Sequence, residues 1–228
     1  MEALDHRRAR SQATKDALMR AAEKLIAELG MENVSIREIV NAAGQKNESA
    51  LQYHFKNLTG LLEAIHAERS AQVQSRRADL LRELLEQTPA PDLRQLCMAM
   101  VQPAFELARS SVDFRRYVRA FGHQLALAET SALSQVTSHG GGGASGQQLT
   151  NLLKEALPQL DTETYVQRME AAVRLCSSSM YHQARQKNAF RGAPAELFLH
   201  SLVDALTGLL SAPMSAEAKA IARSIKTA

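Results

Sequence analysis

The chain has 228 residues, a formal net charge of +3, two cysteines and no tryptophan. Alanine and leucine dominate its apolar content and β-branched runs are few, which predicts an all-α protein. No apolar run approaches the about 18 residues of a membrane span, and the N-terminus is charged rather than signal-like. Cys97 and Cys176 have neither zinc-type nor disulfide-type spacing. We therefore expect a cytoplasmic protein with no membrane partner, metal or cofactor.

The first predicted helix spans residues 14–29. Its apolar residues recur at three- and four-residue steps, which is typical of an amphipathic helix. Gly30 follows, where the end of a helix favours a left-handed backbone. Residues 1–13 carry a basic cluster made of His6, Arg7, Arg8 and Arg10. We expect residues 1–13 to form a flexible basic arm, and a solvated disordered tail without a partner is the alternative.

Two short helices complete the N-terminal part. The sequence Ser35–Glu38 has the pattern of a capping box and begins the second helix. The small residues 42–44 end it, and we expect them to let two helices cross closely. Residues 45–47 form a turn, and a third helix runs from residue 47 or 48 to 54. This arrangement is a helix-turn-helix whose second helix has a polar outer face.

A long fourth helix begins after the capping residue Asn57 and ends before Pro89. At about 30 residues and 1.5 Å per residue it is about 45 Å long, enough to join two parts of the molecule. Further helices are predicted at 92–110, 113–128, 147–157, 161–187 and 194–210. The glycine-rich segment 138–146 is expected to be a flexible connection. It lacks the Lys and Ser/Thr of a phosphate-binding loop, so we reject that function for it.

Residues 14–65 resemble the DNA-binding domain of TetR-family transcriptional regulators. The resemblance lies in AAEKLIAELG (21–30), SIREIVNAAG (35–44), YHF (53–55) and LLEAI (61–65). It implies a helix-turn-helix domain at 1–56 and a helical effector-binding and dimerisation domain at 57–228. The chain departs from the family in three places. The segment between the glycine and the phenylalanine is polar and one residue longer, Gln52 replaces a usual tyrosine, and Leu58 replaces a usual lysine.

Polar residues around the third helix are the candidates for DNA contacts, because an α-helix fits the major groove. Lys reaches guanine, Asn and Gln pair with adenine, and Ser serves either base. The base-contacting candidates are therefore Lys46, Asn47, Ser49 and Gln52. Phosphate contacts, which position the protein without reading sequence, are expected from Ser35, Arg37, Tyr53, His54 and Lys56. For each residue alone, plain solvent exposure is the alternative.

Apolar residues of the C-terminal part are divided between a pocket and a dimer interface. The pocket candidates, each of which has ordinary core packing as its alternative, are Met98, Phe105, Phe114, Tyr117, Phe121, His123, Met169, Cys176, Met180 and Tyr181. The last two predicted helices have apolar faces that are too wide for burial on one side only. The interface candidates are Leu175, Ser179, Leu197, Phe198, Leu202, Leu206, Leu209 and Leu210. The alternative is that both faces lie in the chain's own core.

The favoured function is a homodimeric transcriptional repressor that binds a palindromic double-stranded DNA operator and is released by a small apolar effector. A lipid-like, steroid-like or aromatic effector fits the apolar composition. One alternative is a constitutive DNA-binding protein without an effector. The other is a helical enzyme, which we do not expect, because no H-E-x-x-H, G-x-S-x-G or dinucleotide-binding motif is present.

Overall fold

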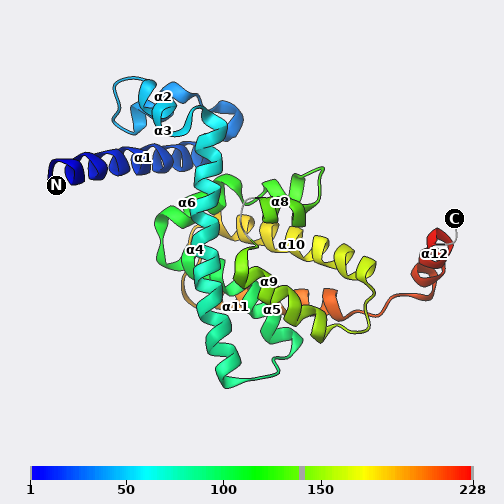
Figure 1. Cartoon of the computed structure of the whole chain (residues 1–228). Helices are drawn as coiled ribbons and strands as arrows, with labels where there is room; N and C mark the ends of the chain where they lie inside the picture. Colours follow the sequence, from blue (N-terminus) through cyan, green and yellow to red (C-terminus); the bar gives the residue numbers. More distant parts are fainter. Residues whose placement is uncertain (1, 139–141, 227–228) are drawn as a thin grey trace.

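The computed structural model describes residues 2–138 and 142–226, and within these ranges the chain is helical with no strand (Figure 1). The all-α prediction is confirmed. The N-terminal elements are α1 (Glu2–Leu29), the 3-10 helix η1 (Met31–Asn33), α2 (Ile36–Ala42) and α3 (Ser49–Phe55). The remaining helices are α4 (Leu58–Gln87), α5 (Leu93–Ser110), α6 (Val112–Phe121), α7 (Gln124–Leu127), α8 (Ala132–Ser138), α9 (Gly143–Ala156), α10 (Thr162–Ala184), α11 (Gly192–Ser211) and α12 (Ala216–Lys226).

Helix α1 begins far earlier than the sequence pattern indicated. Residues 2–13 continue it instead of forming the expected flexible arm, and this extension projects beyond the rest of the domain (Figure 1). The segment is rich in Ala and Arg, which favour helix, and it contains neither glycine nor proline. The amide of Gln12 also donates to Asp16 across one turn, at 2.7 Å. The basic cluster is therefore carried on a helix.

The predicted helix starts at Ser35 and Asn57 are confirmed. The Ser35 hydroxyl accepts from the Glu38 N–H while the Glu38 carboxylate accepts from the Ser35 N–H, which is the capping box. The Asn57 side chain accepts from the Gly60 N–H at 2.9 Å and caps α4. Both caps satisfy N–H groups that have no partner within the helix.

The end of α2 differs from the expectation of close helix crossing. Gly44 has φ +69°, and no atom lies within 4 Å of the place where a Cβ would be. The N–H of Gln45 donates to the carbonyl of Val40 at 3.0 Å, which is a Schellman-type helix end. Gly44 therefore serves the backbone conformation of the turn rather than tight packing.

The C-terminal part has more helices than predicted. The expected single helix at 113–128 is broken after Phe121, giving α6 and α7, and α8 and α12 had no predicted counterpart. Residues 143–146 belong to α9 instead of a flexible connection, and residues 139–141 lie outside the described ranges. The hydroxyl of buried Ser145 donates to the carbonyl of Gln74 at 3.0 Å, which anchors α9 to α4.

Two hydrophobic cores meet at α6. The N-terminal core is built from α1, α2, α3 and the start of α4, and Phe121 of α6 belongs to it. The C-terminal core joins α4, α5, α6, α9, α10 and α11, and Phe114 of α6 belongs to that one. Tyr117, between the two, packs against both. Helix α6 therefore connects the N-terminal part to the larger domain.

A buried ion pair links α1 to α4 beside this junction. The guanidinium of Arg69 donates to both carboxylate oxygens of Glu23, with Nε at 2.7 Å and Nη2 at 2.8 Å. Arg20 donates to Glu23 at 2.8 Å and also to Glu68. The forked geometry fixes the direction in which α1 crosses α4.

Candidate DNA-binding surface and ligand pocket

Helix α3 is held by two apolar side chains and presents a polar face. Leu51 and Phe55 are buried against α1, α2 and α4. Tyr53, on the opposite side, has 81% of its surface exposed. The buried and exposed faces follow from helix periodicity, because residues 51 and 55 are four positions apart and therefore lie one turn apart on the inner face. The outer face of α3 is therefore free of the protein's own core.

The predicted DNA contacts lie on α3, in the turns at its two ends and at the start of α2. His54 is half-buried, and the other candidates are exposed, namely Ser35, Arg37, Lys46, Asn47, Ser49, Gln52, Tyr53 and Lys56. Asn47 and Ser49 are hydrogen-bonded to each other. The Asn47 side-chain oxygen accepts from the Ser49 N–H at 3.1 Å and from the Ser49 hydroxyl, so this pair organises the first turn of α3. The amino group of Asn47 is its remaining donor.

Ser35 is engaged by its capping partner. Its hydroxyl donates to the Glu38 carboxylate at 2.6 Å. The hydrogen bonds from the Ser35 side chain and backbone hold the pKa of Glu38 below its usual value. A neighbouring carboxylate weakens the attraction of this helix end for phosphate, so the cap is the better-supported role of Ser35.

The connection between α3 and α4 is a tight turn at Lys56. This residue has φ +67° and ψ −48°, and the Asn57 N–H donates to the Phe55 carbonyl at 2.8 Å. These values describe a γ-turn, a strained conformation for a residue with a side chain. The turn sets the angle between α3 and α4 and leaves the Lys56 side chain exposed.

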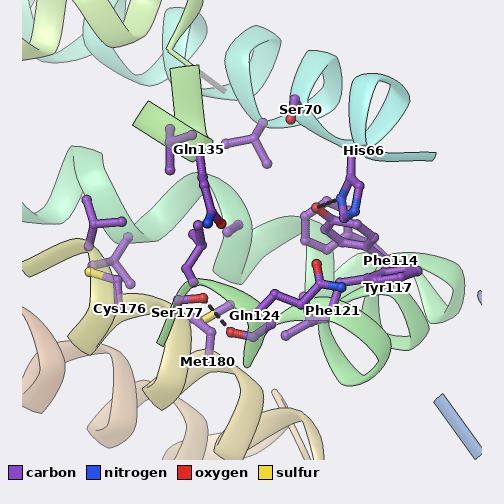
Figure 2. A pocket seen from close by; sticks show the side chains of 18 of the residues that line it. His66, Ser70, Phe114, Tyr117, Phe121, Gln124, Gln135, Cys176, Ser177 and Met180 are labelled. Atoms are coloured by element: carbon purple, nitrogen blue, oxygen red, sulfur yellow. Dashed lines mark hydrogen bonds between the residues drawn. The ribbon is translucent and has the colours of Figure 1, made fainter. Parts of the chain in front are cut away.

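A pocket of about 280 Å³ lies in the larger domain beside α4 (Figure 2). Figure 2 shows His66 and Ser70 above it, the aromatic rings of Phe114 and Phe121 at one end, and Met180 below. Its lining comes from α4, α5, α6, α7, α8 and α10. Because α4 continues from the α3 turn into this lining, one rigid helix touches both candidate sites.

Half of the predicted pocket residues line this cavity. They are Phe114, Tyr117, Phe121, Cys176 and Met180. The rest lie elsewhere. Phe105 is buried in the core against Phe190, with ring centroids 5.6 Å apart, and Met169 is also a core residue. The rings of His123 and Tyr181 pack at a tilt with their centroids 5.0 Å apart, and Met98 packs against the core. These five are not pocket residues in this structure.

The residues of α4 were missed as pocket residues. His66, Ser70, Val73 and Arg77 follow one face of the helix at steps of four, three and four. Polar residues on a long amphipathic helix usually face solvent, so this face of α4 was not predicted to line a pocket. The sequence feature that could have identified these residues is their spacing along one face of the helix, not their residue types.

The polar groups of the pocket do not form a nucleophilic site. The Cys176 thiol has its pKa raised to about 12 by burial, so it stays protonated. The Ser177 hydroxyl donates to the Gly122 carbonyl. His66 Nδ1 and the Tyr117 hydroxyl lie 3.2 Å apart in a hydrogen bond. No group of three or more His, Cys, Asp or Glu side chains in residues 2–138 and 142–226 is placed to hold a metal ion.

Helix α10 holds the α7–α8 segment, which forms part of the pocket lining. Arg174 donates to the carbonyls of Leu125 at 2.8 Å, Ala128 at 3.0 Å and Thr130 at 2.9 Å. The carboxylate of Glu170 accepts from the Ala132 N–H at 2.8 Å. These hydrogen bonds satisfy the backbone groups between α7 and α8, and both helices contribute lining residues.

The interface candidates separate into core and surface. Leu202, Leu206 and Leu210 are buried in the chain's own core, so the expectation that they contact a second copy is corrected. Leu175, Ser179, Phe198 and Leu209 are half-buried. Leu197 has 69% of its surface exposed, and Val166 on α10 has 45%. Both wide apolar faces therefore serve mainly the internal core, with a smaller apolar surface outside.

No single helix within the described residues is long and apolar enough to span a membrane. By length and composition alone, α11 together with the first part of α12 passes such a test as a pair bent by 58°.

A helix-turn-helix with an exposed polar second helix, joined by a long helix to a second helical domain, defines a DNA-binding regulator. The family model for bacterial regulatory proteins of the tetR family matches residues 18–65. A second model, described as "Tetracyclin repressor-like, C-terminal domain", matches residues 98–212. The matches cover more than half of the chain, which belongs to the TetR family of transcriptional regulators.

Solved structures show the same fold. A TetR family transcription regulator from Marinobacter aquaeolei VT8 has 18% identity and a TM-score of 0.56, with 87% of this chain and 97% of that chain covered. The fatty acid degradation regulator FadR from Bacillus halodurans has 17% identity and a TM-score of 0.57, with 87% and 99% covered. At these identities the likeness concerns the fold alone. No curated protein sequence matches the chain.

Proposed function

We propose that the chain is a homodimeric transcriptional repressor that is released from its operator when a small molecule fills the pocket. The observation that carries the proposal is the path of α4, which follows the α3 turn and then lines the pocket with residues 66–77. A ligand that changes the position of α4 changes the spacing of two α3 helices on DNA. The ligand must bind the released state more tightly than the DNA-bound state.

The cavity supports ligand response over constitutive DNA binding. An apolar cavity with a few polar groups, set beside the helix that carries the DNA-binding part, is the usual form of a small-molecule site. A constitutive DNA-binding protein has no use for such a cavity. The pocket chemistry, with its protonated thiol, also supports binding rather than catalysis.

Replacing Lys46 with alanine is expected to weaken binding to DNA from upstream of the protein's own gene by about 1–3 kcal/mol, because Lys46 is exposed beside the start of α3. Fluorescence anisotropy at two salt concentrations measures the loss. If Lys46 contacts a phosphate, the salt dependence also becomes shallower by about one counterion. Lys219→Ala, an exposed lysine on α12, is the matched control. Equal affinity of Lys46→Ala and wild type contradicts a DNA role for this surface.

Replacing Leu197 with glutamate is expected to favour the monomer, because an exposed apolar side chain on α11 suits an interface and a charge there does not. Sedimentation equilibrium gives the mass, which for the wild type should be twice 25.0 kDa. Val112→Glu, at another exposed apolar residue, is the control. A wild-type protein that sediments as a monomer at DNA-binding concentrations speaks against the dimer.

A further inference from the structure

We propose that the pocket binds a linear amphiphile with a carboxylate head, whose head pairs with Arg77 and whose apolar body lies along α4. The proposal rests on the ligand-responsive function above and names the class of ligand for the same pocket. It follows from the distribution of charge and shape within the cavity.

The charges of the residues that line the pocket indicate which head group the ligand has. Among the described residues that line the pocket, Arg77 carries the only formal charge at neutral pH, with histidine counted as neutral, and none is Asp or Glu. The Nε atom of Arg77 is buried, and burial lowers the pKa of its guanidinium. A carboxylate offsets the cost of a buried guanidinium and matches its planar fork. Arg77 also has contacts within the protein. The proposal uses the charge of its guanidinium and its place in the lining, and it does not require Arg77 to be without a partner.

The opposite end of the pocket has a different electrostatic character. Tyr117 lies there with Phe114 and Phe121 (Figure 2). Burial raises the pKa of Tyr117, and the nearby charge of Glu23 raises it further. No lining residue at the aromatic end carries a formal charge, and the Tyr117 hydroxyl is already hydrogen-bonded to His66, so an anionic head is better placed at Arg77. This difference orients the ligand, with its apolar end against the rings.

The shape of the pocket indicates that the apolar body of the ligand is linear. His66 and Arg77 lie on one face of α4, about 16 Å apart along the helix axis. Val73 and the α5 residues Val101 and Ala104 line the pocket with apolar surface. A cavity of about 280 Å³ that follows a helix face over this length is narrow. It suits an extended chain better than a fused ring system.

Three ten-carbon probes separate the possibilities. Isothermal titration of the full-length protein without DNA compares decanoate, decanol and decylamine. We expect decanoate to bind at least tenfold more tightly than either of the others. Arg77→Gln should lower decanoate affinity at least tenfold, and Arg77→Lys, which keeps the charge without the fork, should lower it less. Arg82→Gln, at an exposed arginine of α4 paired with Asp79, should change nothing.

The proposal is overturned if decanol or decylamine binds as tightly as decanoate, if none of the three binds, or if Arg77→Gln binds decanoate like the wild type. Circular dichroism establishes that each variant is folded, and Arg77→Lys carries the test if the glutamine variant is not. Anisotropy with operator DNA is a separate readout. Decanoate binding that leaves DNA affinity unchanged contradicts the regulatory function while leaving the ligand class supported.

Discussion

Above about pH 8, where Glu23 is ionised, the Arg69→Met variant is expected to lose about 3–5 kcal/mol of unfolding free energy, because it leaves a buried carboxylate without its partner. The side chains of Arg69 and Glu23 are 4% and 1% exposed, so water cannot replace the lost ion pair. Urea denaturation measures the change. The double variant Glu23→Leu with Arg69→Met, which removes both charges, should recover most of the loss. A single variant as stable as the wild type contradicts a structural role for the pair.

The same pair predicts a dependence on pH. Burial raises the pKa of Glu23 from 4.5 to about 8, while the charge of Arg20 opposes the shift. The folded protein then holds this proton more tightly than the unfolded chain, so unfolding free energy falls as pH rises from about 4.5 to about 8. In Arg69→Met this fall should be steeper than in the wild type. Denaturation at about pH 5.5 and pH 8.5 measures both slopes, and parallel slopes contradict the assignment.

Replacing Gly60 with alanine is expected to cost about 3 kcal/mol and to abolish operator binding, because the added Cβ has no space. It would lie 2.1 Å from the carbonyl oxygen of Phe55. That oxygen is held by the γ-turn hydrogen bond from the Asn57 N–H. Relief of the clash requires movement of α3 relative to α4, which displaces the surface that we propose to contact DNA.

Urea denaturation and anisotropy with operator DNA test the Gly60 variant. Thr59→Ala is the matched control, since residue 59 is exposed on the same turn and a change there should stay within about 0.5 kcal/mol. A Gly60→Ala protein with wild-type stability and DNA affinity would mean that the turn adapts without cost.

Local signals predicted the N-terminal domain well. The caps at Ser35 and Asn57 depend on hydrogen bonds within four residues, so the sequence pattern contains the whole interaction. The break after Phe121 has a different cause. The carbonyl of Gly122, where α6 ends, accepts from the Ser177 hydroxyl of α10, and a Cβ on Gly122 would lie 2.6 Å from the Val118 carbonyl oxygen and 3.1 Å from the Cβ of Tyr181 on α10. The approach of α10 is a contact between distant segments. No local pattern reveals such a contact.

The two candidate sites also differ in how far the sequence could predict them. The exposed face of α3, which we propose to contact DNA, follows from one short amphipathic helix, so its exposed positions were predictable. The pocket is built from six helices, and the sequence could indicate apolar residues without showing which of them border a cavity. Phe105 and Phe114 are both buried aromatic residues, yet only the second of these two lines the pocket. Core and cavity wall have the same composition and differ in packing.

Because α6 belongs to both hydrophobic cores, the helix-turn-helix domain of this chain cannot be exchanged freely for that of a relative. Helix α1 packs against α6, and Phe121 of α6 is buried among residues of the DNA-binding part. A hybrid regulator that joins a foreign helix-turn-helix to this chain at residue 57 would place new side chains against Phe121 and Tyr117. Engineering a new operator specificity therefore calls for transplanting only the outer face of α3, or for replacing the α1–α6 contact together with the helix-turn-helix.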